Sequence, residues 1–314
     1  MREKVNGVSN TLKTINDKKF NDVFIEITHG EDLGTKNNKE LRLFRLKEII
    51  DNDFSKDLLN KFVSRNIGHY VFSRSKVQEY YDEGDEMSAG IEALDLMWAS
   101  GDADQKGSGN ELGEVLIYAF LESVLDAPKV YSKVELNRTV RNHSSMCDSI
   151  HLKVFPQSGA TLNYEMVFGS SSVVGDLGLA IDEAFKQVKR IQGNKPDEIQ
   201  IVDQTVFDLP EDDPIAMKIS DLITPDDTGK KASRDSAYGL FLGYTLGLDK
   251  TRPDYRDVVD KKMEADLKKY LPSIQNHIQT LGLKNRSFYV YILPFDDAET
   301  DKNVVMKKVM RKGG

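Results

Sequence analysis

The sequence predicts an α/β fold built around a partly antiparallel sheet. A well-patterned helix is expected at 111–125, and a second at 176–191. Between them lie three strand-like segments, 129–137, 148–155 and 162–168. Apolar residues therefore recur every three or four residues in the two helices and every second residue in the strands between them. A helix, three strands and a helix in succession are typical of a mixed sheet of about three to five strands covered by helices.

Length and composition describe a globular chain. It has 314 residues, of which 39% are hydrophobic and 30% charged, as in soluble domains. No apolar run approaches the roughly 20 residues that cross a bilayer, and the basic, polar segment Met1–Lys19 does not resemble a secretory signal. A single cysteine, Cys147, excludes a disulfide framework and a multi-thiolate zinc site. We therefore expect a cytoplasmic protein without a membrane partner.

The net charge of −8 argues against a protein that binds nucleic acid non-specifically along its length. It does not exclude an enzyme that binds nucleic acid through one face. The attraction of nucleic acid depends on the charges near that face and not only on the net charge of the chain. The charge is uneven: residues 197–227 are strongly acidic, whereas 302–314 carry five basic residues and no acid. Both segments are most simply solvated surfaces.

The first hundred residues mix strand-like and helical segments. The β-branched run Val23–Ile27 predicts a strand, and the spacing in 39–50 and 56–63 is mixed. Segment 78–99 predicts one helix. The polar stretch 101–110 predicts a loop and a helix start.

The core helix and the segments after it are more regular. Residues 111–125 place apolar side chains at three- and four-residue spacing, which predicts packing against a sheet. The later chain predicts strands at 199–202, 238–246 and 288–293, an acidic loop at 210–227 and a long amphipathic helix at 255–281.

Carboxylates stand at the ends of these core elements. Glu111 and Glu114 lie in the first turn of the first core helix, and Asp148 opens the second strand on the same parity as Ile150 and Leu152. A carboxylate on a core-facing position is costly unless it finds a partner or a metal. Alone, Asp148 would more simply be a turn residue at a strand edge.

A helix glutamate, a strand-end aspartate and then a third strand is the layout of restriction-endonuclease-like (PD-(D/E)xK) enzymes. In these the third strand carries Glu-x-Lys, and the spacing of two puts both side chains on one face. The carboxylates hold Mg²⁺, with Mn²⁺ as the usual substitute, and the metal activates water. The lysine adds positive charge.

Several motifs make the resemblance more specific. Glu111-Leu-Gly-Glu114, Ser132-Lys133, Cys147-Asp148-Ser-Ile-His151 and Val167-Phe-Gly-Ser-Ser-Ser172 occur in that order. Together they resemble the HamA/AbpA family, the nuclease subunits of Hachiman and related bacterial anti-phage systems. The resemblance is close over 110–191, and 288–295 is similar to the family's closing strand.

The resemblance implies a set of site residues, and this sequence differs from the family pattern at two of them. Matching the family's Gly-Glu pair to Gly113-Glu114 makes Glu114 and Asp148 the metal ligands. Aligning Gly169 with the family's Leu-Gly-Glu-x-Lys places Ser170 at the glutamate and Ser172 at the lysine. A serine hydroxyl is neutral and replaces neither group well. We expect the chain as written to be weak or inactive as a nuclease, either as a degenerate relative or through inactivating substitutions.

Other polar residues have smaller expected roles. The resemblance includes Lys133, which is a candidate for phosphate contact, although an exposed strand lysine is common. Cys147 is expected to be a small buried residue, His151 a packed or a surface histidine, and His143 a residue of a polar connection. The absence of Gly-Lys-Ser/Thr after Gly107-Ser-Gly109 excludes a phosphate loop.

The resemblance also implies a partner and a division of the chain. The partner is a superfamily 2 DExH helicase (HamB-like) that uses ATP and restrains the nuclease until it meets abnormal DNA. We expect residues 1–100 to form an N-terminal α+β region and 101–314 to form the nuclease domain. Either the first hundred residues or the basic tail would supply the surface that binds the partner. Two alternatives stay open: a non-catalytic scaffold that binds DNA or the helicase, and an α/β enzyme acting on another substrate.

Overall fold

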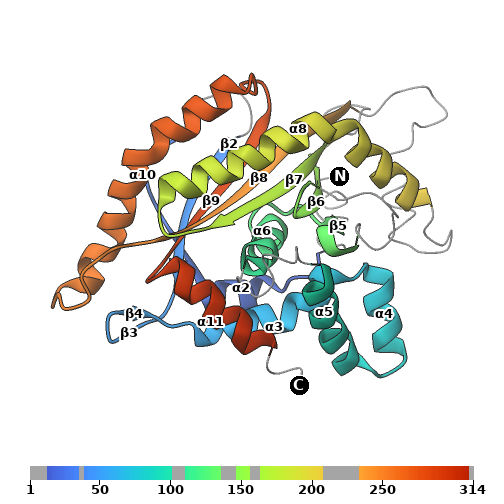
Figure 1. The fold of residues 1–314 in the computed structure, drawn as a ribbon, viewed down its shortest axis with the longest axis horizontal. Helices are drawn as coiled ribbons and strands as arrows, with labels where there is room; N and C mark the ends of the chain where they lie inside the picture. The colour runs from blue at the N-terminus through green and yellow to red at the C-terminus, as the bar shows by residue number, and fades with distance from the viewer. Residues whose placement is uncertain are drawn as a thin grey trace.

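A seven-stranded mixed sheet forms the centre of the molecule (Figure 1). The computed structural model describes residues 13–34, 39–100, 110–135, 146–155, 163–207 and 233–310. The strand order is β1-β2-β9-β8-β7-β6-β5, in which β2, β9, β8 and β7 run parallel and the outer pairs are antiparallel. The strands are β1 (Phe24–Ile27), β2 (Lys39–Leu46), β5 (Lys129–Ser132), β6 (Ser149–Val154), β7 (Asn163–Val173), β8 (Ser233–Thr245) and β9 (Ser287–Phe295).

The expected α/β class is confirmed, and the sheet is larger than the three to five strands expected. The strands β1 and β2 extend it beyond β9, so chain segments from both ends of the sequence pair there. A separate hairpin pairs β3 (Ile49–Ile50) with β4 (Asp53–Phe54). Long-range pairing of this kind leaves no local mark in the sequence.

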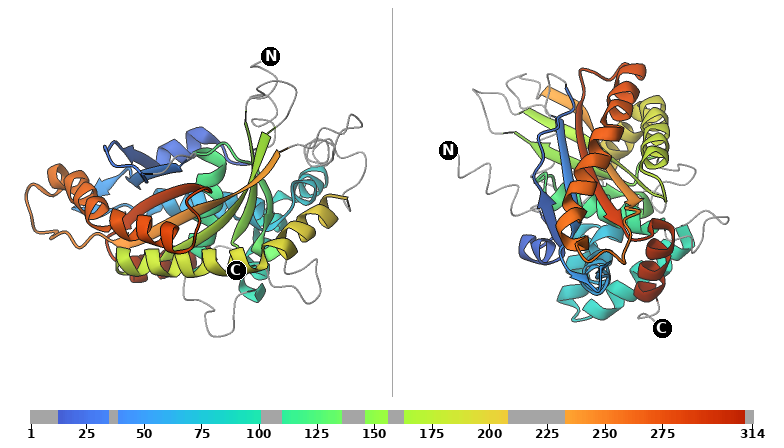
Figure 2. Two further views of the ribbon diagram at one scale, coloured as in Figure 1. Left: turned by 90° about the horizontal axis from the view of Figure 1, so that it is seen from above. Right: turned by 90° about the vertical axis from the view of Figure 1, so that its left-hand side faces the viewer.

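Helices cover both faces of the sheet (Figures 1 and 2). On one face α6 packs against β7 and β8, with α3 and α11 behind it; on the other, α8 packs against the same two strands and α10 packs against α8. The helices are α2 (Asp17–Val23), α3 (Asp57–Val71), α4 (Arg74–Asp82), α5 (Glu86–Ser100), α6 (Glu111–Ser123), α8 (Leu177–Phe207), α10 (Tyr255–Thr280) and α11 (Ala298–Met310). The helix–sheet–helix layering predicted from the core segments is therefore present.

Three expected elements have different bounds or type. The helix expected at 78–99 is two helices, α4 and α5, separated at Gly84, whose φ of +71° is left-handed and ends a helix. The strand expected at 199–202 is wrong, because those residues continue α8. The strand expected at 129–137 ends at Ser132.

Two further segments differ near the site and at the C-terminus. The third core strand, expected at 162–168, continues as β7 to Val173. The basic tail contains helix α11, and its Lys302 is only 4% exposed. The buried ammonium donates to Asn110 Oδ1 at 3.0 Å and to the Val173 carbonyl at 2.9 Å. His143 and the acidic segment 210–227 lie outside the described residues.

A close approach between α6 and β7 sets the distance between helix and sheet. A Cβ placed on Gly113 would lie 2.7 Å from Ser171 Oγ, and one placed on Gly169 would lie 3.2 Å from the Ile117 side chain. At Gly113 a side chain would press α6 away from the strand, whereas at Gly169 it would collide first with Ser149 Oγ of β6, at 2.7 Å, and would crowd Ile117 of α6. The first turn of α6 is thereby held against the end of β7.

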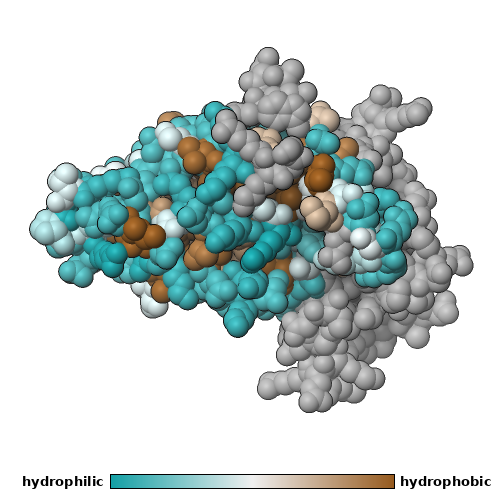
Figure 3. Space-filling model, turned by 90° about the horizontal axis from the view of Figure 1, so that it is seen from below, coloured by the Kyte–Doolittle hydropathy of each residue, from teal (hydrophilic) through white to brown (hydrophobic). Residues whose placement is uncertain are grey.

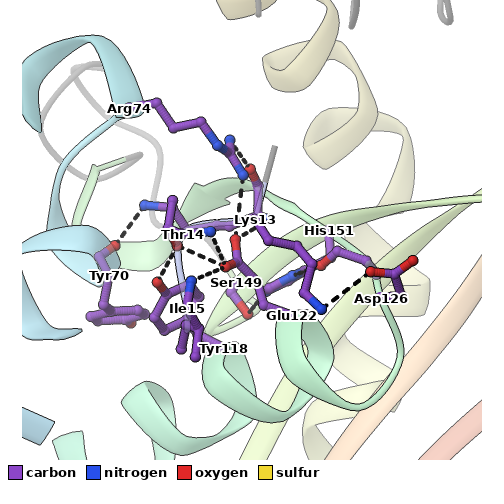
Figure 4. A network of polar contacts seen from close by, with 12 residues as sticks. Lys13, Thr14, Ile15, Tyr70, Arg74, Tyr118, Glu122, Asp126, Ser149 and His151 are labelled. Atoms are coloured by element: carbon purple, nitrogen blue, oxygen red, sulfur yellow. Dashed lines mark hydrogen bonds and ion pairs between the residues drawn. The ribbon is translucent and has the colours of Figure 1, made fainter. Parts of the chain in front are cut away.

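The other end of α6 is fixed by a buried polar network (Figure 4). The fully buried Glu122 carboxylate accepts from the Thr14 hydroxyl at 2.7 Å, from the backbone N–H groups of Thr14, Ile15 and Lys129, and from Arg74. Burial alone would raise the pKa of Glu122, but the Arg74 charge and these donors outweigh it and lower the pKa. The carboxylate therefore stays charged inside the protein.

The same network reaches the helix pair α3–α4. The buried Lys129 ammonium donates to the carbonyls of Tyr70 and Phe72, both at 2.8 Å. Burial lowers the pKa of Lys129 to about 8. His151 lies between the Ala127 carbonyl and the Ser149 hydroxyl, at 2.8 and 3.0 Å, so of the two positions expected for it, packed or surface, the structure has the packed one.

The outer surface is mainly polar, as the composition predicts for a globular chain. In the view from below, the coloured atoms are mostly hydrophilic, with small separate apolar areas (Figure 3). Among the described residues, no helix has both the length and the apolar character needed to cross a membrane.

We predict that Glu122→Ala lowers the free energy of unfolding by about 3–5 kcal/mol, because it leaves Arg74 and several buried N–H donors without an acceptor. Urea denaturation measures the change. The matched control is Glu79→Ala, which removes a half-exposed carboxylate paired with Lys76 and should change stability by less than about 1 kcal/mol. Equal losses in both variants would contradict the prediction.

Candidate functional site

The first turn of α6 presents Glu114 toward two other elements. Its Oε1 lies 3.3 Å from Lys133 Nζ, and its Oε2 accepts a hydrogen bond from the Tyr70 hydroxyl at 2.9 Å. Lys133 follows β5, and Tyr70 comes from α3. The Glu114 side chain is 16% exposed, so it can meet a ligand while held by these neighbours.

Asp148 lies at the edge of β7, beside the same cluster. Its carboxylate accepts from the Ser171 hydroxyl at 2.6 Å and from the Ser171 backbone N–H. Its carbonyl accepts from the Lys133 N–H at 2.9 Å and lies 3.1 Å from the Tyr70 hydroxyl. The structure therefore brings three of the candidate residues, Glu114, Asp148 and Lys133, together with Tyr70 and Ser171.

Ser170 and Ser172 do not contact Asp148. The Ser172 hydroxyl donates to Glu183 Oε2 of α8 at 2.8 Å, and the fully buried Ser170 hydroxyl has no hydrogen-bond partner among the described residues. Neighbouring residues of a strand point to opposite faces. Ser170 and Ser172 therefore belong to the α8 face of β7, whereas Ser171 belongs to the α6 face.

The expected placement of Asp148 on a strand face was wrong for a local reason. Asp148 lies in a bend just before β6, so strand alternation does not set its direction. The β6–β7 pairing ends at Ser149 and Gly169. The Asp148 carboxylate lies along the edge of β7 beyond that pair and bonds Ser171 there. The assignment of Ser170 and Ser172 as catalytic positions stays a prediction.

Burial makes this cluster of carboxylates electrostatically costly. Burial, followed by the nearby charge of Glu114, raises the pKa of Asp148 to about 7. Burial also raises the pKa of Glu111, one of whose carboxylate oxygens has no hydrogen-bond partner in the part of the chain that the structure describes. Raised carboxylate pKa values at one place are typical of sites that bind or react.

The donor set suits a hard divalent cation. Glu114 and Asp148 supply carboxylate oxygens, and Mg²⁺ is often bound through one or two carboxylates together with substrate phosphates. Within the described part of the chain, no group of three or more His, Cys, Asp or Glu side chains is arranged to hold a metal ion. Glu114 and Asp148 are therefore the two carboxylates of this cluster that could hold a cation.

One further residue considered from the sequence is packed in the core, and two residues of the cluster were not predicted. Cys147 is fully buried, as expected. Tyr70 and Ser171 were missed by sequence reasoning. Tyr70 carries no motif, because it reaches the site only through the packing of α3. Ser171 lies inside the Gly-Ser-Ser-Ser run, where the strand's bounds were needed to tell which serine faces α6.

The family comparison covers nearly all of these elements. The HamA family model matches residues 20–309, from α2 through α11. The chain belongs to the HamA family. Members of the HamA family are components of the Hachiman anti-phage defence system. A comparison with curated proteins gives no match.

We predict that Asp148→Asn stabilises this HamA-family chain at pH 8 by about 1–2 kcal/mol, as replacements of costly site residues often do. The folded-state pKa of Asp148, about 7, lies above the ordinary value of 3.8. Its contribution to stability is therefore full below pH 3.8 and is lost as the pH rises toward 7. Asparagine does not ionise and avoids this loss.

Urea denaturation at pH 4 and pH 8 measures the effect. The gain from Asp148→Asn should appear at pH 8 and nearly vanish at pH 4. The control Asp235→Asn, at an exposed carboxylate, should be nearly neutral at both values. A loss of stability at pH 8 in Asp148→Asn would contradict the pKa assignment.

Proposed function

We propose that this chain is the DNA nuclease subunit of a Hachiman system, dependent on Mg²⁺ in its active form and weak or inactive as written. The observation that carries the proposal is the convergence of Glu114, Asp148 and Lys133 at the end of β7. It combines two acidic oxygens for a metal with a lysine for a phosphate. HamA family membership supports the same biological setting.

The chain's residues have distinct roles in this proposal. Glu114 and Asp148 would hold the metal, which when bound would activate water and neutralise charge on a phosphodiester. Tyr70 donates to Glu114 and fixes one of its oxygens. Lys133 is one-third exposed and would bind a DNA phosphate, as surface lysines do in phosphate recognition.

Reduced activity follows from the chemistry of β7. No carboxylate or lysine occupies 169–173, where Gly169 and three serines precede Val173. Serine hydroxyls supply neither the negative charge that a cation needs nor the positive charge that stabilises a developing oxyanion. We infer that Ser170→Glu and Ser172→Lys together restore the family pattern.

The partner in this proposal is an ATP-dependent superfamily 2 DExH helicase, HamB-like, that restrains cleavage until abnormal DNA is met. The support is the resemblance to nuclease subunits together with family membership. A restrained nuclease is compatible with an acidic chain, because a net charge of −8 weakens unspecific attraction to host DNA.

Plasmid cleavage tests the nuclease proposal. We expect the chain carrying Ser170→Glu and Ser172→Lys to cut in Mg²⁺, and the unmodified chain to cut at least about 100-fold more slowly, since single electrostatic groups contribute that much. Chelation of Mg²⁺ should abolish cutting. Assays with and without the helicase and ATP distinguish a restrained from an inactive enzyme.

The matched control adds Asp148→Asn to the restored chain. It should abolish cleavage while preserving the fold, which circular dichroism and urea denaturation verify. Cleavage that survives Asp148→Asn would show that the catalytic carboxylate lies elsewhere.

The alternative is a non-catalytic scaffold that keeps the fold to bind DNA or the helicase. The serines at 170 and 172 favour it, because they leave the fold intact while removing the reactive groups. Here Lys133→Ala should weaken DNA binding and reduce the salt dependence of binding by about one counterion. The control Lys76→Ala, at an exposed lysine of α4, should change binding little. Cutting by the restored chain would favour the nuclease.

A further inference from the structure

Helix α5 has apolar side chains on two sides. Ala89, Ala93 and Met97 recur every four residues and are buried, and among the described elements α5 packs against α3 and α4 (Figure 1). Met87 and Ile91 lie on another side of the helix, because residues two positions apart in an α-helix point in nearly opposite directions.

This second side is largely exposed. Met87 is 81% exposed and Ile91 is 41% exposed, and Leu94, which follows at helical spacing, is half-buried. A helix that is apolar on all sides is usually buried on all sides. The described part of the chain thus leaves Met87, Ile91 and the outer part of Leu94 uncovered. These three side chains are called the α5 stripe below.

Acidic side chains surround the α5 stripe. Residues 77–97 contain seven acidic residues and no basic one. Glu79 pairs with Lys76 at 2.9 Å. Five other acids are exposed and form no ion pair with any described residue: Asp82, Glu83, Asp85, Glu92 and Asp95. The last two follow Ile91 by one and four positions, so they lie beside the stripe.

The charge indicates which kind of molecule covers the stripe. Nucleic acid and anionic membrane surfaces are repelled by unpaired carboxylates. A second copy docked through the same surface in a two-fold dimer would place acids against acids, which is costly. A protein segment with an apolar face and basic side chains beside it is complementary to both the stripe and its charge.

We infer that the α5 stripe, with Glu92 and Asp95 beside it, is a docking surface for a basic, amphipathic helix of a partner protein. An amphipathic helix buries apolar residues at three- and four-residue spacing against such a surface. The inference deepens the proposed function and rests on it, because it assigns the surface at which the restraining partner binds. The α5 stripe is separate from the cluster of Glu114, Asp148 and Lys133.

Peptide binding tests the surface on the full chain. The probe is a leucine–lysine peptide of about 18 residues, or five helical turns, with leucines at three- and four-residue spacing, and fluorescence anisotropy measures its Kd. We expect Met87→Ser combined with Ile91→Ser to raise Kd at least about tenfold, because apolar contact area is lost. Glu92→Gln with Asp95→Asn should raise Kd about threefold and reduce its salt dependence. An unchanged Kd in the serine variant would overturn the inference.

Matched controls separate docking from general attraction. Leu179 is 58% exposed on α8, and Asp235 and Asp257 are exposed acids outside 77–97. Leu179→Ser, and Asp235→Asn combined with Asp257→Asn, should leave Kd within about twofold. A peptide of the same composition in scrambled order should bind at least about tenfold more weakly, because it has no apolar face. Equal binding of the scrambled peptide would show attraction by charge alone and would overturn the docking surface.

Hydrogen exchange tests the same surface in the complex with the purified helicase. Amides of α5 should exchange at least about threefold more slowly when the helicase is added, because a covered helix opens less often. The serine variant at positions 87 and 91 should lose this protection, and Leu179→Ser should keep it. Binding of the helicase without protection of α5 would overturn the inference.

The two proposals fail in different ways. If the helicase does not bind, the partner in the proposed function is wrong, and the peptide measurements alone decide whether α5 is a docking surface. If the helicase binds and the Kd of the peptide is insensitive to Met87 and Ile91, the partnership stands and the docking surface is overturned. Plasmid cleavage decides the nuclease activity independently of both results.

Discussion

The close approach of α6 to β7 is the constraint on which the rest of the structure depends. Gly113 and Gly169 remove side chains at the points where helix and strand meet Ser171 and Ile117. This contact fixes the height of the first turn of α6 above the sheet. Glu114 consequently lies within reach of Lys133 and Tyr70, next to the edge that Asp148 occupies.

Two buried carboxylates show how differently the fold treats structure and site. Glu122 is surrounded by Arg74 and several N–H and hydroxyl donors, and its pKa is lowered despite complete burial. Asp148 is bonded by Ser171 but lies near Glu114, and its pKa is raised to about 7. The first carboxylate stabilises the fold, whereas the second is held at a cost that a bound cation would offset.

Strand β7 connects the two faces of the sheet. Its alternate residues contact α6 through Ser171 and α8 through Ser172. The cluster of Glu114, Asp148 and Lys133 therefore lies on the α6 side of this strand, and the pair Ser172–Glu183 lies on the α8 side. Ser170 and Ser172 are small and buried, and the strand carries no charged side chain between Gly169 and Val173.

The sequence by itself determined the α/β class, the helix carrying Glu114 and the family, because apolar periodicity and motif order are local properties. It also indicated that Glu114, Asp148 and Lys133 belong together. Only the tertiary structure decided that Asp148 bonds Ser171, that Ser172 faces Glu183, and that Tyr70 joins the cluster. These depend on where strand pairing ends and how helices pack from distant parts of the chain, which local spacing does not specify.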